Sequence, residues 1–369
     1  MHSTSSGEVP DLQHLKQVSR IKHRILEKYL PAWVVILGSA NEKLCYFDCF
    51  AGPGRYETIV GPTDGSPVVA VKAAQQILRE KPTQRIVMLF MERDSEQLGK
   101  LDRHLEPLKP FLRNLTVQTV LEDSRTLVPT LLSRVPELAP SFFMVDPYGH
   151  PLSLQVINEI LKRPKTEVLI NLMWFRVNMD LANPSMHRHL NTLFGDELWQ
   201  QQPFMSLHGE SRERSFLEYF ISRTEARYVL QFRIGFDDKE DRISGERTKY
   251  YLLHASNNSR AVLLMKEVMW PLGDEEGTFD YSGKSQGVLI SRTPREEELR
   301  DILIKEFAGR ELSFDEIREK TWKLPFIEKH YRSVIQTLRK EGRVNVISVT
   351  SKGVGLSRRD RVAFLAGKG

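Results

Sequence analysis

Acidic residues follow four apolar segments of the chain, each where a strand is expected to end. They are Asp48 in DCFAGPG, Glu92 in MERD, Asp123 in LEDSR and Asp146 in VDPYG. Because the carboxyl ends of parallel strands meet at one edge of an α/β sheet, the four carboxylates are predicted to surround one crevice. If the four acids were only helix caps, they would not be expected to occur in the order along the chain that binding of a nucleoside cofactor requires. The set therefore predicts a cofactor site.

The first of these motifs joins an acid to a glycine turn. Gly52 and Gly54 let the backbone turn sharply and let a ligand approach the main chain. Asp48 can accept a hydrogen bond from an amino or cationic group at the strand end. A dinucleotide fingerprint needs G-x-G-x-x-G, and its third glycine is absent here, which argues against NAD. An ordinary strand-to-helix turn is the alternative.

The second and third motifs place a carboxylate after each of the next two strands. Glu92 is positioned to accept both hydroxyls of a ribose, and Asp123 to accept the amino group of adenine. The spacing from Gly54 to Glu92 exceeds the usual ~20 residues, and the intervening GPTDGSP accounts for the excess. We expect that segment to form a loop over the pocket, with Asp64 and Ser66 near the ligand. For an acid at a strand end, a simple helix cap is the alternative.

The fourth motif has the residue types of an acceptor site. Asp146 is predicted to point into the crevice, and Tyr148 offers a flat face on which a base or another planar group can stack. Asn171 and Arg176 follow the fifth strand and are candidates for the same side of the site. Capping of the core is an equally good explanation for those two.

The order of apolar and amphipathic segments predicts the fold that positions these side chains. From residue 44 to residue 175, short apolar runs alternate with segments of helical periodicity. This pattern predicts an α/β fold, a Rossmann-like parallel sheet with helices on both faces. A helix over residues 11–30 is expected before the first strand, because its apolar residues recur at helical spacing.

The rest of the first domain, residues 1–272, departs from this alternation. Residues 178–225 predict a helical insertion that acts as a cap or lid. YVLQFRIGFD and TKYYLLHASN, joined by a charged turn, predict an antiparallel hairpin that ends the sheet with a reversed strand. Residues 273–290, rich in Gly and acids, predict a linker.

Residues 291–369 predict a small C-terminal unit with a basic tail. Three amphipathic segments and a short hairpin are typical of a winged helix-turn-helix, with a capping box at Ser313 and Glu316 and a helix stop at Gly342. Residues 321–369 hold eleven Lys or Arg against three Asp or Glu. A solubilising tail, attraction to DNA or RNA, and packing against another protein all fit this charge. The candidate nucleic-acid contacts are Lys329, Arg332, Arg339 and Lys340 on the third helix and Lys352 on the wing.

Composition favours a soluble, cytoplasmic protein without a membrane span. No run of about 18 apolar residues occurs, and the N-terminus lacks the apolar segment of a signal peptide. Cys45 and Cys49 lie in one strand and at its exit, a poor geometry for a disulfide, so both are predicted to be packing residues. His187 and His189 have no accompanying Cys or acidic cluster, so no metal site is predicted.

Taken together in this order, and preceded by the helix ending in KYLPAW, the four motifs carry a family likeness. They resemble the class I S-adenosylmethionine-dependent methyltransferases and, more narrowly, the three-Cys-motif partner (TcmP) family of prokaryotes, whose members pair FAGPG with DPYG or DPFG. The likeness covers roughly residues 11–270, and a trailing winged helix also suits that family.

The resemblance implies a role for each motif. The methionine part of S-adenosylmethionine is expected at the first motif, the ribose at Glu92 and the adenine edge at Asp123, while Asp146 and Tyr148 face the substrate. It also implies a partner, a neighbouring protein with a three-cysteine motif similar to that of radical S-adenosylmethionine enzymes. The residues expected at the first motif are Asp48, Phe50, Gly52 and Gly54.

Two departures leave the reaction open. Amino methyltransferases that act on bases commonly have D-P-P-Y, whereas this chain has D-P-Y-G, so Tyr148 comes one position early. The 5-methylcytosine enzymes need a Pro-Cys nucleophile, and the matching position here is Asp-Pro. Two hypotheses remain, a methyltransferase acting on nucleic acid and a non-catalytic accessory protein that keeps the fold.

Overall fold

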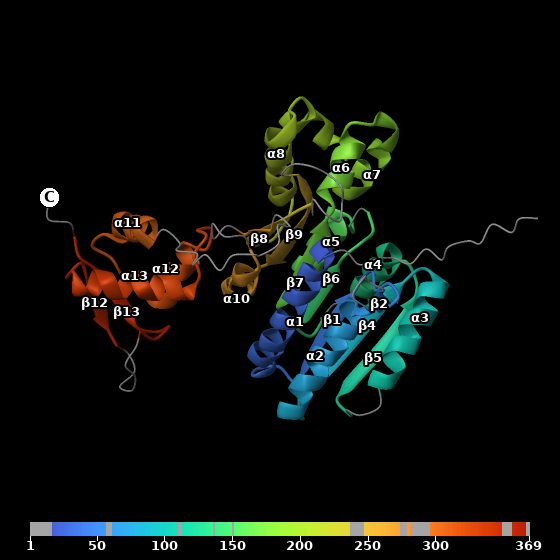
Figure 1. Cartoon of the computed structure of the whole chain (residues 1–369), viewed down its shortest axis with the longest axis horizontal. Helices are drawn as coiled ribbons and strands as arrows, with labels where there is room; N and C mark the ends of the chain where they lie inside the picture. The colour runs from blue at the N-terminus through green and yellow to red at the C-terminus, as the bar shows by residue number, and fades with distance from the viewer. Residues whose placement is uncertain are drawn as a thin grey trace, which may run out of the picture.

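The computed structural model describes most of the chain (Figure 1). The described residues are 17–56, 61–109, 113–135, 137–149, 151–236, 247–273, 279–281, 296–348 and 356–366.

An eight-stranded sheet with the order β10-β8-β9-β7-β6-β1-β4-β5 forms the centre of the larger part. Strands β7, β6, β1, β4 and β5 are parallel neighbours. Strand β9 runs antiparallel between β7 and β8, which confirms the expected hairpin and reversed strand. The strands are β1 Lys43–Asp48, β4 Arg85–Glu92, β5 Leu115–Leu121, β6 Ser141–Val145, β7 Thr166–Leu172, β8 Tyr228–Gly235, β9 Thr248–Ser256 and β10 Asp280–Tyr281.

Helices cover both faces of this sheet, as the alternating pattern predicts (Figure 1). Consecutive residues of a strand point to opposite faces, so Tyr46 joins the apolar core under α1, α2 and α10, while Phe47 joins the core under α4 and α5. The α/β Rossmann-like prediction is therefore confirmed. The helices are α1 Gln17–Gly38, α2 Ser66–Glu80, α3 Ser95–Leu105, α4 Ser124–Arg134, α5 Leu154–Leu161 and α10 Ser259–Met269, with 3₁₀ turns at Glu106–Leu108 and Trp270–Leu272.

Helix α1 is longer than its sequence pattern indicated. We expected it to end at residue 30, and it continues through Pro31 to Gly38; residues 11–16 lie outside the described part. Proline removes one helical hydrogen bond. Burial of Trp33 and Val34 in the core beyond it offsets that cost.

A buried carboxylate fastens the second half of α1 to the sheet. Glu167 of β7 accepts hydrogen bonds from the Tyr29 hydroxyl, from Trp33 Nε1 at 3.1 Å and from His254 Nε2 of β9 at 2.9 Å. Burial and the neighbouring Glu167 carboxylate hold the pKa of Tyr29 well above its usual value, so its hydroxyl stays protonated.

The helical insertion follows β7 directly. It begins at residue 174, four residues earlier than expected, and carries its own aromatic core around Phe194, Phe204 and Phe216. Trp199 is fully buried and donates to Asn191 Oδ1 at 2.9 Å. Its helices are α6 Trp174–Leu181, α7 His187–Phe194 and α8 Gly209–Ser222, with short turns at Pro184–Met186, Leu198–Gln201 and Pro203–Met205.

The C-terminal unit has a separate apolar core that includes Leu303, Phe314 and Tyr331. The capping box of Ser313 and Glu316 is present as predicted. Its three-stranded antiparallel sheet has the order β11-β13-β12, and β13 lies within the segment expected only as a basic tail. The elements are α11 Glu296–Phe307, β11 Glu311–Ser313, α12 Phe314–Lys320, α13 Glu328–Lys340, β12 Val344–Ile347 and β13 Arg361–Phe364.

Within the segment expected as a linker, β10 pairs in parallel with β8. Among the residues that the structure describes, no helix combines the length and apolar content needed to cross a membrane.

Replacing Glu167 by Ala should lower the free energy of unfolding by about 3 to 5 kcal/mol, because three buried donors lose their acceptor together. Urea denaturation measures the loss. Glu159→Ala is the control: this glutamate pairs with Lys162 on the surface at 2.8 Å, and its loss should cost below about 1 kcal/mol. Equal effects of the two variants would contradict the anchoring role of Glu167.

Candidate functional site

The four predicted carboxylates lie at the carboxyl ends of four adjacent strands. Asp146 follows β6, Asp48 ends β1, Glu92 ends β4 and Asp123 follows β5. From β1 the chain proceeds outward through β4 to β5, and then returns to β6 on the other side of β1. The strand order reverses between β1 and β6, the position at which open α/β sheets bind ligands.

Asp48 is a fully buried carboxyl at that reversal. It accepts the Phe50 amide at 3.3 Å and the Tyr46 hydroxyl at 3.4 Å, and it also hydrogen-bonds to Ser66. Burial raises the pKa of Asp48 from 3.8 to about 7, with a further contribution from the charge of Asp146, and the hydrogen bonds only partly offset the increase. The site therefore holds an acid whose charge is incompletely compensated by protein groups.

The glycine turn after β1 is tied to the neighbouring strand. Gly52 has φ +62° and Gly54 has φ +79°, a left-handed conformation that favours glycine. The Gly52 amide donates to Glu92 Oε2 at 2.8 Å, and the Asp94 amide donates to Oε1 of the same carboxylate at 2.9 Å. Because each carboxylate oxygen can accept a second bond, Glu92 retains capacity for a ligand.

Asp123 is the N-cap of α4 and accepts the Arg125 amide at 2.9 Å. Asp123 therefore has the helix-capping role that was the alternative prediction, and its side chain is also near the guanidinium groups of Arg93 and Arg125. Arg125 lies 5.3 Å from the ring of Phe50, so the first and third motifs are neighbours in space.

Asp146 is held from two sides. Asn171 of β7 donates Nδ2 to Asp146 Oδ1 at 2.6 Å, and Lys22 of α1 forms an ion pair with Oδ2. Asn171 thus joins Asp146, as proposed for the acceptor side. Lys22 was not anticipated, because the helical pattern of α1 does not indicate which of its side chains reach the strand ends.

His23 is a second unanticipated member of the site. It is buried and stacks on Tyr56, with ring centroids 6.4 Å apart. Burial, with the adjacent Lys22 charge, lowers the pKa of His23 to about 4 although Asp146 and Asp64 oppose the shift, so the imidazole is neutral near pH 7.

Three buried atoms near these strand ends have no hydrogen-bond partner among the described residues: His23 Nδ1, Asn171 Oδ1 and Ser124 Oγ. Buried polar atoms are normally hydrogen-bonded, so a polar ligand at this edge of the sheet would provide their missing hydrogen-bond partners. Within the same described part of the chain, no group of three or more His, Cys, Asp or Glu is arranged to hold a metal ion.

The remaining predicted residues of the sheet domain differ in accessibility. Ser66 is buried beside Asp48, whereas Asp64 is bound by Arg55 at 2.9 Å and by Lys72. Tyr148 is fully exposed, and Arg176 is exposed on α6. Cys45 and Cys49 are free and buried, in agreement with a packing role.

The predicted basic residues of the C-terminal unit are not equivalent. Lys329, Arg339 and Lys340 are exposed. Arg332 is half-buried and forms an ion pair with Glu328 at 2.5 Å, so much of its charge is neutralised within the protein. Lys352 lies outside the described residues.

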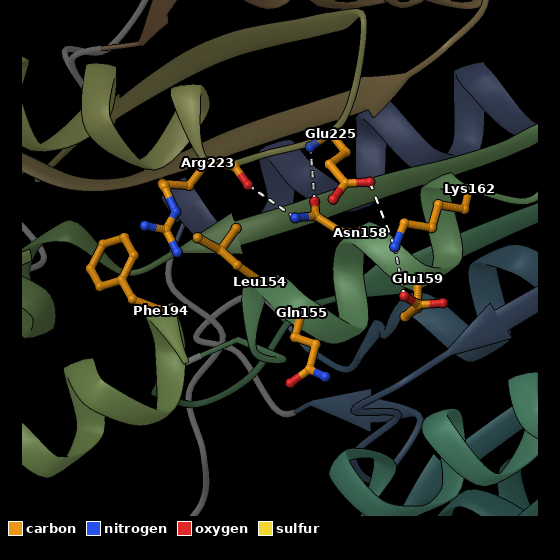
Figure 2. Close-up of a pocket in the computed structure, with 8 residues that line it drawn as sticks. All are labelled: Leu154, Gln155, Asn158, Glu159, Lys162, Phe194, Arg223 and Glu225. Atoms are coloured by element: carbon orange, nitrogen blue, oxygen red, sulfur yellow. Dashed lines mark hydrogen bonds and ion pairs between the residues drawn. The ribbon is translucent and has the colours of Figure 1, made fainter. Parts of the chain in front are cut away.

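A separate pocket of about 270 Å³ lies between α5, α7 and the end of α8 (Figure 2). Its polar groups satisfy one another: Asn158 bonds to the Arg223 carbonyl at 3.0 Å and to the Glu225 amide at 2.9 Å, while Lys162 pairs with Glu159 and Glu225. None of the predicted site residues lines it. We interpret the contacts around this pocket as a structural link between the helical insertion and the sheet.

Comparison with known proteins gives structural neighbours only. No family model and no curated protein sequence matches the chain. A Legionella pneumophila protein of the DUF519 family aligns with 13% identity, a TM-score of 0.38, and coverage of 68% of this chain and 91% of its own. A SAM-dependent methyltransferase from Agrobacterium tumefaciens aligns with 11% identity, a TM-score of 0.35, and coverage of 66% and 63%.

A third neighbour is an O-methyltransferase from Bacillus cereus in complex with SAH, with 13% identity, a TM-score of 0.33, and coverage of 62% of this chain and 80% of its own. At these scores, the fold assignment rests on the chain's own strand order.

Replacing Gly54 by Ala should destabilise the turn. The left-handed conformation costs a non-glycine residue roughly 1–2 kcal/mol, and a new Cβ would lie 2.8 Å from Leu101 Cδ1. Gly149→Ala is the matched control, since a Cβ there meets nothing within 4 Å and its φ is not in the left-handed region. Thermal unfolding should show a lower midpoint for Gly54→Ala alone; equal midpoints would show that the turn tolerates a side chain.

Proposed function

We propose that this chain is an S-adenosylmethionine-binding protein of the class I methyltransferase type that acts on or with nucleic acid. The observation that carries the proposal is Asp48, a buried acid with a pKa near 7 at the point where the strand order reverses. A ligand with an ammonium and a sulfonium charge would supply the compensation that the protein groups do not.

The cofactor's parts match the groups along this edge. Asp48, Gly52 and Gly54, with Phe50 beside them, would hold its methionine part, and Glu92 its ribose. Asp123 would hold the adenine edge, and the neighbouring Ser124 Oγ is buried without a partner among the described residues. When bound, S-adenosylmethionine supplies a methyl group on a cationic sulfur.

On the acceptor side, we assign positioning rather than acid–base chemistry to the protein. Asp146, fixed by Lys22 and Asn171, would orient the acceptor, and the fully exposed ring of Tyr148 is available for stacking. Arg176 is exposed on α6, close to Asn171 in the chain, and its guanidinium is available to bind a phosphate group of a nucleic acid. Alignment of an acceptor with the methyl carbon is the main requirement of this displacement.

We extend the proposal to the three-Cys-motif partner family, on the residues FAGPG and DPYG. The chain would then work in the cytoplasm beside a three-cysteine, radical S-adenosylmethionine-like protein. The C-terminal unit, which we propose is a winged helix because its order is α11-β11-α12-α13-β12-β13, would dock that protein or nucleic acid.

One observation favours a second candidate, a non-catalytic accessory protein. Both carboxylate oxygens of Asp146 already have partners within the protein, one in Asn171 and one in Lys22. A protein that keeps the cofactor pocket as a sensor or scaffold needs no free group at that position.

Affinity for S-adenosylmethionine should rise with pH. A bound cation lowers the pKa of Asp48, so binding releases a proton where free Asp48 is protonated, and affinity at pH 6 should be about tenfold below that at pH 8. Isothermal titration calorimetry in buffers of different ionisation enthalpy measures both effects. Asp48→Asn should bind more weakly at pH 8 and lose this pH dependence.

The Asp48→Asn variant also has a folding control with a defined sign. Because the folded pKa lies above 3.8, wild-type stability should fall as pH rises from about 4 to about 7, and the variant should lack this fall. Urea midpoints at several pH values measure it. A wild type that gives no heat with S-adenosylmethionine at pH 8 would overturn the cofactor proposal.

Transfer of a labelled methyl group separates the two candidate functions. With DNA, RNA or a protein lysate as acceptor, Tyr148→Ala should reduce transfer about 10- to 100-fold, because a stacked base contributes about 1–3 kcal/mol. Cofactor affinity should not change, and Tyr148→Phe should retain transfer. A wild type that binds the cofactor but transfers nothing would favour the accessory function.

A further inference from the structure

The start of the third helix of the C-terminal unit is partly covered by the sheet domain, although Lys329 in its first turn is exposed. Glu267 of α10 accepts the Glu328 amide at 2.7 Å, and the preceding Lys266 donates to the carbonyls of Trp322 and Leu324 at 2.8 and 2.6 Å. Lys266 is only 1% exposed. The turn between α12 and α13 is therefore packed against α10 of the sheet domain, which covers one side of the start of α13.

Several arginines of this unit are already paired with acids. Glu328 bonds to Arg318 at 2.8 Å, to Arg332 at 2.5 Å and to Arg358 at 2.9 Å. Elsewhere, Arg300 pairs with Glu341 at 2.8 Å, and Arg361 pairs with Glu311. The number of basic residues in the tail is therefore larger than the number of positive charges that are free to bind a polyanion.

Four other cations gather at one end of the unit, which we call the basic end: Arg310, Arg339, Lys340 and Arg343. Arg339, Lys340 and Arg343 lie at the end of α13 and in the turn after it. Arg310 precedes β11, and its carbonyl accepts the Phe364 amide at 2.9 Å, while the Arg343 carbonyl accepts the Leu365 amide at 3.0 Å. The segments that carry Arg310 and Arg343 therefore lie on either side of β13, about 10 Å apart by the usual spacing of strands.

The basic end is open and uncompensated within the part of the chain that the structure describes. All four side chains are exposed, and none forms an ion pair with a described residue. The two acids next to these residues in the chain, Glu311 and Glu341, are bound by Arg361 and Arg300. The aromatic rings at this end, Phe307 and Phe364, are buried, so the surface offers cations without a stacking platform.

We propose that the basic end of the C-terminal unit, rather than the start of α13, contacts the phosphate backbone of a nucleic-acid duplex. Closely spaced cations that form no ion pair within the described residues suit the charge density of a duplex, although Arg310 also lies 5.8 Å from the centroid of the buried Phe307 ring. Single-strand sites, in contrast, depend on exposed aromatic rings. This inference rests on the nucleic-acid part of the proposed function and names the surface that serves it.

The test compares two full-length variants with the same change in net charge. The first carries Arg310→Gln, Arg339→Gln, Lys340→Gln and Arg343→Gln. The matched control carries four substitutions at exposed lysines elsewhere on the unit: Lys305→Gln, Lys320→Gln, Lys323→Gln and Lys329→Gln. Fluorescence anisotropy of a short labelled DNA duplex, titrated at several salt concentrations, gives the slope of log affinity against log salt, and thermal unfolding verifies that both variants fold.

The basic-end variant should reduce the magnitude of this slope by about 3.6, about 0.9 for each of the four lost phosphate contacts, and the lysine control by less than about 1. An equal or larger loss in the control overturns the proposal. Tighter binding of the corresponding single strand than of the duplex also overturns it. A wild type without salt-dependent binding refutes the nucleic-acid part of the proposed function itself, an outcome distinct from the other two.

Discussion

The parallel pairing of β1 with β4 on one side and β6 on the other is the constraint on which the rest of the site depends. It buries the end of β1 among neighbours, so Asp48 cannot be solvated and its pKa rises. It also forces the chain to leave β1 by a turn that only glycine accommodates easily, and brings the Gly52 amide to the Glu92 carboxylate. The electrostatics of the pocket thus follow from strand order.

Helix α1 completes this edge from outside the sheet. Its first half provides Lys22 and His23 at the strand ends, and its second half is fixed by Glu167 at the opposite end of β7. Since a helix is stiff, the two attachments are coupled. The position of the Lys22 ammonium at Asp146 therefore depends on a hydrogen-bond network at the far end of the sheet.

The placement of acids at strand ends could be predicted from the sequence because the signal is local. Acids after apolar runs, and glycines after the first of them, reflect the chemistry of a strand end, so Asp48 and Glu92 could be found without a fold. Lys22 and His23 could not, because the packing of α1 decides which of its side chains reach the site. Strand β13 was missed for a similar reason, since its partner β11 lies on the other side of α12, α13 and β12 in the chain. The pairing of Arg332 with Glu328 is a four-residue helical spacing that sequence alone could have shown.

The contact between the two parts of the protein includes two adjacent polar side chains of α10, beside contacts such as Ser259 with Glu319 and Trp270 with His330. On α10, Lys266 meets carbonyl oxygens after α12, and Glu267 meets an amide at the start of α13, so each charge faces the complementary end of a helix. A helix turns about 100° per residue. Insertion of one residue in α10 before Lys266 would rotate both groups away together. The orientation of the C-terminal unit thus depends on the rotation of α10 about its axis, which sets the direction of both side chains.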